Sequence, residues 1–244
     1  MNRFFIDKEN ISKEYITIEG ENIKHIKNVI RLKEGDKIEI SSEGILYICN
    51  IYRIENKKVI AKILHREFGN HEPPISIILY QGLPKSSKMD FIVQKATEIG
   101  VKEIYPIITN RTVVKIDNNK KEKNKVDRWN KISEEAAKQS KRDIIPKVNS
   151  VLSFKEMINI LKDEENILVP YENQEGIGIK DIIKKISNKK IHVIIGPEGG
   201  FEEEEIEELK DIGSNTVSLG PRILRTETAG IVALSILLYE LGDM

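Results

Sequence analysis

The fold of this protein is decided by the stretch IHVIIGPEGGF, residues 191–201. It begins as a mostly apolar, β-branched run, typical of a buried strand, and continues into a loop of glycines, a proline and a glutamate. Four glutamates at 202–205 follow, and they predict a helix start because acidic side chains complement the helix dipole there. A buried strand, a glycine loop and a helix form the repeating unit of an α/β domain with a mostly parallel sheet.

The glycine loop also predicts a ligand site. Glycines at a strand end let a ligand approach the backbone closely. The loop has neither the GxGxxG spacing of dinucleotide sites nor the Gly-Lys-Ser/Thr of a phosphate loop, and the following glutamates would repel a phosphate. A neutral or cationic ligand, of which S-adenosylmethionine is one, fits better. From the local sequence alone, an ordinary strand-to-helix turn is the alternative.

A second loop of the same kind is LGPRILRTETA, residues 219–229, which runs from a strand end into the last helix. In parallel sheets such loops meet at the carboxyl edge, so the two loops predict one pocket. Arg225 and Glu227 either pair with each other or line that pocket. The small residues Ala229, Gly230 and Ala233 predict close packing of the helix on another helix, with a dimer interface as one outcome.

The remainder of the second half alternates strands with helices. Ser87 is predicted to cap a helix that ends at Gly100, with Asp90 reciprocating the capping bond. A helix at 128–141 carries an apolar stripe that ends at Gln139, which is either a core polar residue or an RNA contact. The further predicted strands are 75–80, 103–108, 166–169, 191–195 and 216–219, and the further helices are 180–186, 202–211 and 227–241.

The first seventy residues have a different pattern. Short strands rich in Ile, Val and Tyr are predicted at 37–40, 45–51 and 58–64, with one helix at 21–32. These elements indicate a small β-barrel. The segment FGNHEPP, 68–74, interrupts any element through its two prolines, which places the domain boundary there and predicts domains of 1–72 and 73–244.

The charge of the chain is balanced in total but uneven in distribution. Its 39 basic and 39 acidic residues divide into net charges of +1 for 1–72, +7 for 73–150 and −8 for 151–244. The basic segment favours a polyanion partner, unless Lys120, Lys121, Lys123 and Lys125 form only a solvated loop. The acidic surplus, mainly residues 202–208, is predicted to face solvent away from RNA, and RNA binding is predicted to depend strongly on salt.

Other classes of protein are disfavoured by what the sequence lacks. A lone Cys49 makes no internal disulfide and is expected to be a buried, inert thiol. The four histidines lack metal-ligand spacing, so no metal is predicted. The charged N-terminus and the short apolar runs predict a cytoplasmic protein without a membrane segment.

Four motifs together resemble a known family. They are KMDFIVQKATEIGV (88–101), the RW…EAAKQS…R…P pattern (128–146), IIGPEGGF (194–201) and LGPRILRTETA (219–229). In this order they resemble the bacterial ribosomal RNA small subunit methyltransferase E family, of the SPOUT superfamily. The opening MNRFFID and the segment 25–40 resemble the family's PUA-like RNA-binding domain, so the resemblance covers the whole chain. One departure is Lys141, where relatives often have a small residue.

The resemblance implies a PUA-like β-barrel followed by an α/β SPOUT methyltransferase domain with a C-terminal trefoil knot. It implies S-adenosylmethionine as cofactor, a homodimer, and methylation of N3 of a uridine in 16S ribosomal RNA or the small subunit. The alternative is a noncatalytic ribosome-binding or assembly factor that keeps the fold. By position in the motifs, the cofactor-binding residues are Val169, Pro170, Ile195, Gly196, Gly199, Gly200, Leu219, Leu224, Arg225 and Thr226.

The implied reaction indicates which residues are candidates for catalysis and for RNA binding. Uridine N3 must lose its proton, which requires a base or a cation that stabilises the anion. Glu198 and Glu227 are the candidate carboxylates, and Arg225 or Arg142 of the partner subunit is the candidate cation, with no choice made among them. Because N3 lies on the pairing edge, the base must be unpaired. The proposed RNA contacts are Arg3, His25, Arg31, Lys95, Arg111, Gln139 and Arg142.

Overall fold

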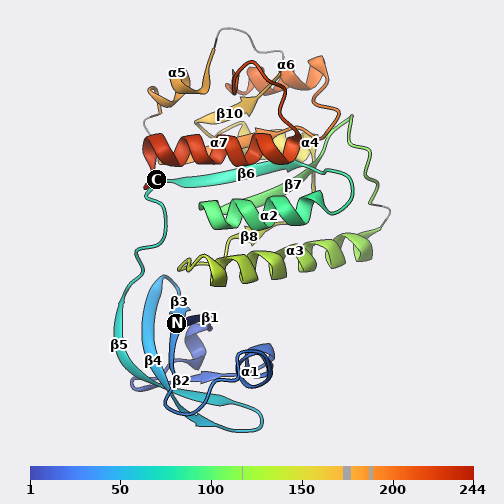
Figure 1. Ribbon diagram of the computed structural model, residues 1–244. Coiled ribbons are helices and arrows are strands. Elements are labelled where there is room, and N and C mark those ends of the chain that lie inside the picture. Colours follow the sequence, from blue (N-terminus) through green and yellow to red (C-terminus); the bar gives the residue numbers. More distant parts are fainter. Residues whose placement is uncertain (117, 173–176, 187–188) are drawn as a thin grey trace. The chain divides into compact units, whose positions relative to one another are not determined.

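The computed structural model describes residues 1–116, 118–172, 177–186 and 189–244. The chain forms two compact units (Figure 1). Unit 1 comprises Met1–Glu72 and Ala137–Ile145, and unit 2 comprises Pro73–Ala136 and Pro146–Met244. Unit 1 therefore contains a segment, 137–145, that lies in the sequence between the two parts of unit 2.

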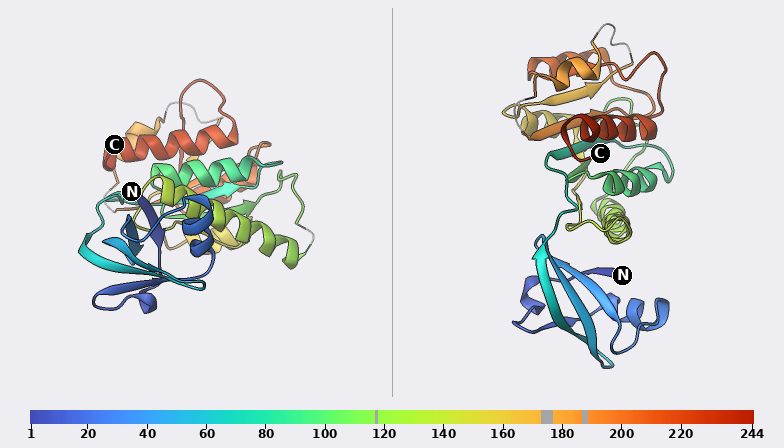
Figure 2. Two further views of the ribbon diagram at one scale, coloured as in Figure 1. Left: turned by 60° about the horizontal axis from the view of Figure 1, so that its bottom comes forward. Right: turned by 60° about the vertical axis from the view of Figure 1, so that its left-hand side comes forward.

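Unit 1 is built on a five-stranded sheet that curls around its own core (Figure 2). The strand order is β1-β3-β4-β5-β2, and only β1 and β3 are parallel. Inward residues such as Phe4, Ile16 and Ile38 are almost completely buried. The strands are β1 (Asn2–Phe5), β2 (Tyr15–Ile18), β3 (Lys37–Ser42), β4 (Ile45–Ile54) and β5 (Val59–Phe68).

The three predicted strands of this unit are present, but β1 and β2 had no prediction because each is only four residues long. The predicted helix at 21–32 is shorter: α1 (Glu21–Lys24) continues as a π-helical turn at His25–Val29. It ends there because Arg31 has a φ of 55°, which no right-handed helix accommodates. Cys49 is fully buried, as predicted, and burial raises the pKa of its thiol to about 12.

Unit 2 contains a parallel sheet in the order β12-β10-β11-β6-β7-β8, with β9 also paired to β7. Every pairing in it is parallel, so the carboxyl ends of the strands share one edge. The strands are β6 (Ser76–Gly82), β7 (Glu103–Ile108), β8 (Lys147–Val148), β9 (Leu152–Ser153), β10 (Ile167–Pro170), β11 (Lys190–Ile195) and β12 (Asn215–Val217).

Helices cover both faces of this sheet, as the alternating pattern predicted. Core residues of α2, α5 and α7 join one cluster, and those of α4 and α6 join the cluster on the other face. Alternate residues of β6 divide between the clusters: Ile77 and Leu79 face the first, Ile78 and Tyr80 the second. The helices are α2 (Lys88–Ile99), α3 (Asn119–Gln139), α4 (Phe154–Leu161), α5 (Ile179–Ile183), α6 (Glu203–Asp211) and α7 (Thr226–Leu241).

One local prediction about helices is wrong, the cap of α2, and two open alternatives are removed. Ser87 makes no side-chain capping bond to α2, and the Asp90 carboxylate instead accepts from Arg128 of α3. Lys120 and its lysine neighbours lie in the first turns of α3, which begins well before residue 128, and do not form a loop. Gln139, at the end of the same helix, is exposed and is not a core residue.

The small residues of α7 pack within unit 2. Gly230 and Ala233 are buried against the sheet, and a Cβ at Gly230 would lie 3.3 Å from Gln81 Oε1 and 3.7 Å from Ile195 Cγ1. The helix also runs beside α2 (Figure 1). The small-residue face is therefore used by the unit's own core, because the chain backbone comes close to β6 and β11 there.

Candidate active site

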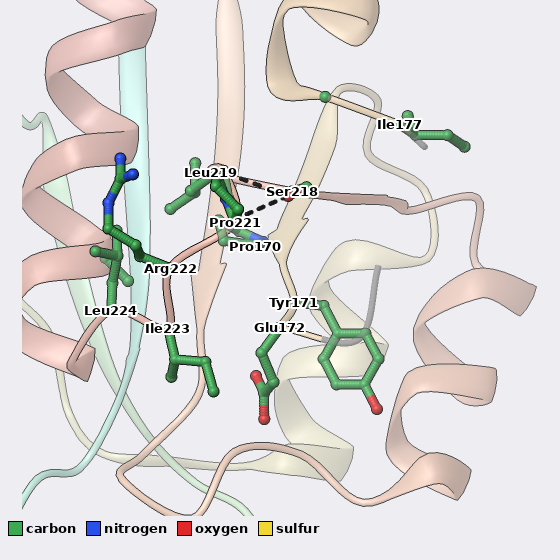
Figure 3. A pocket seen from close by; sticks show the side chains of 13 residues that line it. Pro170, Tyr171, Glu172, Ile177, Ser218, Leu219, Pro221, Arg222, Ile223 and Leu224 are labelled. Atoms are coloured by element: carbon green, nitrogen blue, oxygen red, sulfur yellow. Dashed lines mark hydrogen bonds between the residues drawn. The ribbon is translucent and has the colours of Figure 1, made fainter. Parts of the chain in front are cut away.

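The candidate active site lies at the carboxyl edge of the parallel sheet of unit 2. The loops after β10 and β12 enclose a pocket of about 660 Å³, within the size range of small-molecule sites (Figure 3). They are joined by backbone bonds from Ser218 N to Ile177 O (2.9 Å) and from Tyr171 N to Val217 O (3.0 Å). The lining residues are Pro170, Tyr171, Glu172, Ile177, Gly178, Ser218, Leu219, Gly220, Pro221, Arg222, Ile223, Leu224 and Ala229.

Two glycines let the strand ends come together here. A Cβ at Gly82, the last residue of β6, would lie 2.4 Å from the backbone nitrogen of Pro197, so no side chain fits at that position. Gly200 has a φ of +68°, and a Cβ there would lie 2.7 Å from Glu172 Oε1. The carboxylate of Glu172 therefore rests close to the backbone of the glycine loop and beside the pocket.

A buried relay fixes the glycine loop to α7. The hydroxyl of Thr226 donates to Gly196 O (2.6 Å) and accepts from Gln81 Nε2 (2.8 Å). Gln81 is fully buried near the end of β6, and its Nε2 also donates to Gly82 O (3.1 Å). Three segments that are distant in sequence are thereby held in one arrangement.

A charged cluster lies beside the relay. Lys88 Nζ lies 3.1 Å from Glu198 Oε1 and 3.3 Å from Glu227 Oε2. The Glu198 carboxylate also accepts from the backbone N–H of Lys85 (3.0 Å). Burial raises the pKa of Glu198, but the Lys85 N–H and the Lys88 ammonium lower it more, so the carboxyl stays below its ordinary value. A carboxylate held ionised in this way is better suited to positioning than to accepting a proton.

The loop after β7 supports the glycine loop from another side. Arg111 Nη1 donates to Gly199 O (3.2 Å), and Asn110 N donates to Glu205 Oε1 (2.9 Å). Glu205 is buried and its other oxygen accepts from Glu202 N (2.9 Å), which caps α6. The prediction that all of 202–208 faces solvent is therefore wrong at Glu205, because its carboxylate satisfies two buried backbone donors.

Three of the ten predicted cofactor residues line the pocket, and the other seven do not. Pro170, Leu219 and Leu224 line the pocket. Val169 and Ile195 are buried where β10 and β11 end, and support the loops from beneath. The loop residues Gly196, Gly199 and Gly200 and the helix start at Thr226 lie in the segments just described, while Arg225 is exposed before α7.

The proposed RNA residues differ in how exposed they are. Arg31, Arg111 and Gln139 are exposed, whereas His25 is half-buried with its ring edge against Phe4. Lys95 is half-buried and donates to Glu98 Oε2 (2.8 Å) on the same helix.

Arg3 and Arg142 lie in a buried ionic network of unit 1. Arg3 is 4% exposed and donates to Glu39 (3.1 Å) and Asp143 (2.9 Å). Arg142 is 3% exposed and pairs with Glu72. Both guanidinium groups are occupied by carboxylates, so their positions favour a structural role over a contact with RNA phosphate, and for Arg142 over catalysis.

Lys141, the departure from the motif, lies next to this network. Its φ is 59°, a left-handed conformation that costs a non-glycine residue energy. Its ammonium lies 3.2 Å from Glu39 Oε1.

Three residues of the site were missed by sequence reasoning: Gln81, Lys88 and Glu172. Lys88 opens the motif KMDFIVQKATEIGV, and Glu172 follows the strand that supplies Val169 and Pro170, so both positions carried a signal. Gln81 carried only the weaker signal of a polar residue inside an apolar strand.

Among the residues that the structure describes, no group of three or more His, Cys, Asp or Glu side chains is placed to hold a metal ion. None of the described helices has the length and apolar character needed to cross a membrane.

The fold and the site define a class of protein. A family model for an RNA methyltransferase domain matches residues 71–238, and one for an RNA methyltransferase PUA domain matches residues 18–64. The chain therefore combines an RNA methyltransferase domain with a PUA domain, which confirms the fold class predicted from the motifs.

The similarity to individual proteins is more specific. Ribosomal RNA small subunit methyltransferase E of Bacillus subtilis (strain 168) is 38% identical, over 98% of this chain and 97% of the relative. The protein of the same name from Aquifex aeolicus (strain VF5) is 34% identical, over 96% of this chain and 98% of the relative. A crystal structure of the Neisseria gonorrhoeae protein of this name, bound to S-adenosyl methionine, matches with a TM-score of 0.89 at 29% identity, covering 100% and 99% of the two chains. The chain belongs to the ribosomal RNA small subunit methyltransferase E family.

Proposed function

We propose that this chain transfers a methyl group from S-adenosylmethionine to N3 of a uridine in 16S ribosomal RNA of the small ribosomal subunit, in the cytoplasm. The observation that carries the proposal is the pocket between the loops after β10 and β12, beside a glycine loop and a Lys–Glu cluster. Membership of the family and the S-adenosyl methionine bound to the Neisseria relative support it.

The chemistry of the pocket fits a cationic, phosphate-free cofactor. Glu172 brings a carboxylate to the pocket, and α6 begins with several glutamates, an arrangement that disfavours a phosphate. Leu219, Ile223 and Leu224 offer apolar surface, and the backbone of 218–224 offers polar groups. When bound, S-adenosylmethionine supplies the methyl group on a positively charged sulfur. The proposed contacts are Val169, Pro170, Ile195, Gly196, Gly199, Gly200, Leu219, Leu224, Arg225 and Thr226, with Glu172 added.

The chain's own residues prepare the acceptor base. Holding the nucleotide next to the methyl donor replaces a collision in solution with a reaction at fixed distance. This positioning removes a large part of the activation barrier. The proton on N3 must also leave, for which Glu227 is the better-placed carboxylate, since Glu198 is bound to the Lys85 N–H and to Lys88. An accessible pairing edge requires an unpaired or extruded uridine.

For the RNA we propose contacts through Arg31, His25, Lys95, Arg111 and Gln139, and we leave out the buried Arg3 and Arg142. The proposed domains are 1–72, which would bind RNA, and 73–244, which would bind the cofactor and carry the reaction. Lys95, Arg111 and Gln139 lie in the segment 73–150 of net charge +7, which attracts phosphate despite the neutral total.

We further propose a homodimer and a trefoil knot in unit 2. Tyr239 on α7 is 72% exposed and Ile223 is 86% exposed, apolar surface that a second copy would cover. Light scattering after size exclusion should give twice the chain mass, and Tyr239→Glu should lower the measured mass.

The knot is supported by the chain path, since residues 218–225 lead from β12, at one edge of the sheet, back to α7 on β11 and β6.

The decisive experiment uses a bacterial strain that lacks its own small subunit methyltransferase E gene. Mass spectrometry of 16S rRNA nucleosides should show 3-methyluridine restored when this chain is expressed. Absence of 3-methyluridine, with the chain expressed and folded, would overturn the proposed reaction. Calorimetry with S-adenosylmethionine tests the other candidate, a noncatalytic ribosome-binding or assembly factor, which predicts no binding.

A further inference from the structure

The position of Lys88 works against the stability of its own helix. It is the first residue of α2, where a cation opposes the helix dipole and an acidic residue would be favoured. The residues before it are also unfavourable, since Ser86 has a φ of 58° and Ser87 makes no side-chain cap. Positions where several local rules are broken together are often functional, because stability alone would not select them.

The neighbours of Lys88 fix its ammonium group in place. Glu198 lies 3.1 Å away and is itself held by the Lys85 N–H, so the Glu198 carboxylate acts as a rigid anchor. The Lys88 and Glu198 side chains are each about a third exposed, at 32% and 30%, so the cluster is open to a ligand from one side. An ammonium group has three N–H donors, so one can point to a bound base while another faces Glu198.

Glu227 supplies a second polar atom at the same place. Its Oε2 is buried and, among the described residues, has no hydrogen-bond partner, although Lys88 Nζ lies 3.3 Å away without hydrogen-bond geometry. A buried carboxylate oxygen that has an ion pair but no hydrogen bond can still accept one, so the site is suited to receive a donor from a ligand. A donor and an acceptor therefore lie side by side next to the glycine loop.

We infer that Lys88 and Glu227 together bind the imide edge of the target base and carry its deprotonation. This inference rests on the proposed uridine-N3 methylation. An imide edge presents an N–H next to a carbonyl oxygen, so the N–H donates to Glu227 while the oxygen accepts from Lys88. Glu198 is a positioning residue that holds Lys88.

The step balances. A nitrogen–carbon bond forms at N3, and the sulfur–carbon bond of S-adenosylmethionine breaks with its electron pair retained on sulfur. The imide proton passes to the Glu227 carboxylate and then to water. Lys88 stabilises the negative charge that develops on the carbonyl oxygen, which lowers the barrier in a partly desolvated site.

The test compares Lys88→Met and Glu227→Gln with wild-type full-length protein on 16S rRNA transcripts, and Lys102→Met is the control because Lys102 is exposed and outside the cluster. We expect kcat to fall about 100-fold or more in both variants, as for the loss of an electrostatic or proton-transfer group. The dissociation constant for S-adenosylmethionine, measured by calorimetry, should change less than about threefold, since neither residue is assigned to the cofactor.

A second substrate separates catalysis from folding. In transcripts made with 5-fluorouridine the imide N–H is more acidic and needs less help to ionise. We expect the rates of both variants to be about tenfold higher on this substrate than on ordinary RNA. The rate of Lys102→Met should equal that of wild type on both substrates. If either variant melts below the assay temperature, the other carries the test. Rates within threefold of wild type, or no rescue in the folded variants, would overturn the inference. A wild-type protein that methylates no uridine N3 would overturn the proposed function instead.

Discussion

The hydroxyl of Thr226 offers the sharpest test of how the site is held together. Thr226→Val keeps the shape and the β-branching of the side chain but removes one donor and one acceptor. The donor bonds Gly196 O at 2.6 Å, and the acceptor receives Gln81 Nε2 at 2.8 Å. Gln81 Nε2 retains Gly82 O, so the main loss is one buried bond and an unsatisfied carbonyl at Gly196.

The expected cost is about 1–3 kcal/mol of unfolding free energy, the usual penalty for a buried polar group left without its partner. For a unit of this size, each kcal/mol shifts the melting temperature by about 2–4 °C, so the shift should lie within about 2–12 °C. Thr228→Val is the matched control, because Thr228 is exposed on the same helix turn and Val has the same branching. Urea unfolding of both variants, followed by circular dichroism, gives the difference directly.

The relay also predicts coupling between its members. In a double-mutant cycle with Gln81→Leu, the two losses should not add, and the interaction energy should be about 0.5–3 kcal/mol. Cofactor affinity should fall in Thr226→Val and recover in Thr226→Ser, which restores the hydroxyl. Equal urea midpoints for Thr226→Val and Thr228→Val would refute the reasoning, since the relay would then contribute nothing.

Four further predictions concern other parts of the molecule. Asp143→Ala should destabilise unit 1 by about 1–3 kcal/mol in urea unfolding, because it removes one of the two carboxylates that pair with the buried Arg3, which keeps Glu39. Lys8→Ala, in an exposed pair, should leave the urea midpoint unchanged. Burial raises the pKa of Glu39, but Lys141 and Arg3 lower it by more, so the pKa lies below its ordinary 4.5. The stability that this pairing contributes is therefore present above pH 4.5 and is lost as the pH falls through the pKa of the folded state. Urea midpoints measured against pH should therefore fall more steeply in acid for wild type than for Glu39→Gln. Glu172→Gln should weaken S-adenosylmethionine binding about fivefold by calorimetry, while Glu208→Gln, on the exposed side of α6, should not. The logarithm of the RNA binding constant should fall linearly with the logarithm of salt concentration, and a flat dependence would exclude phosphate contacts as the main source of affinity.

Sequence reasoning succeeded where local patterns carry the physics. The run IHVIIGPEGGF became β11, the glycine loop and the start of α6, because burial, glycine content and helix-end charge are properties of neighbouring residues. One of the two loops that line the pocket, the loop after β12, was also identified, since parallel strands end at a shared edge, whereas the glycine loop after β11 lies beside the pocket. Local reasoning failed at Ser87 and Asp90, where the Asp90 carboxylate is drawn away from the expected cap by Arg128 from another helix.

The amino-acid sequence by itself determined the α/β alternation, the positions of the glycine loop and of the loop after β12, and the family motifs. Only the tertiary structure decided which charged side chains are available. Arg3 and Arg142 resemble RNA contacts in the sequence, yet carboxylates distant along the chain, Glu39, Asp143 and Glu72, enclose them. Lys88 resembles an ordinary helix residue, yet it lies between Glu198 and Glu227. The reason is physical: a charge is free or occupied according to what lies within a few ångströms, and that distance is set by folding and not by sequence separation.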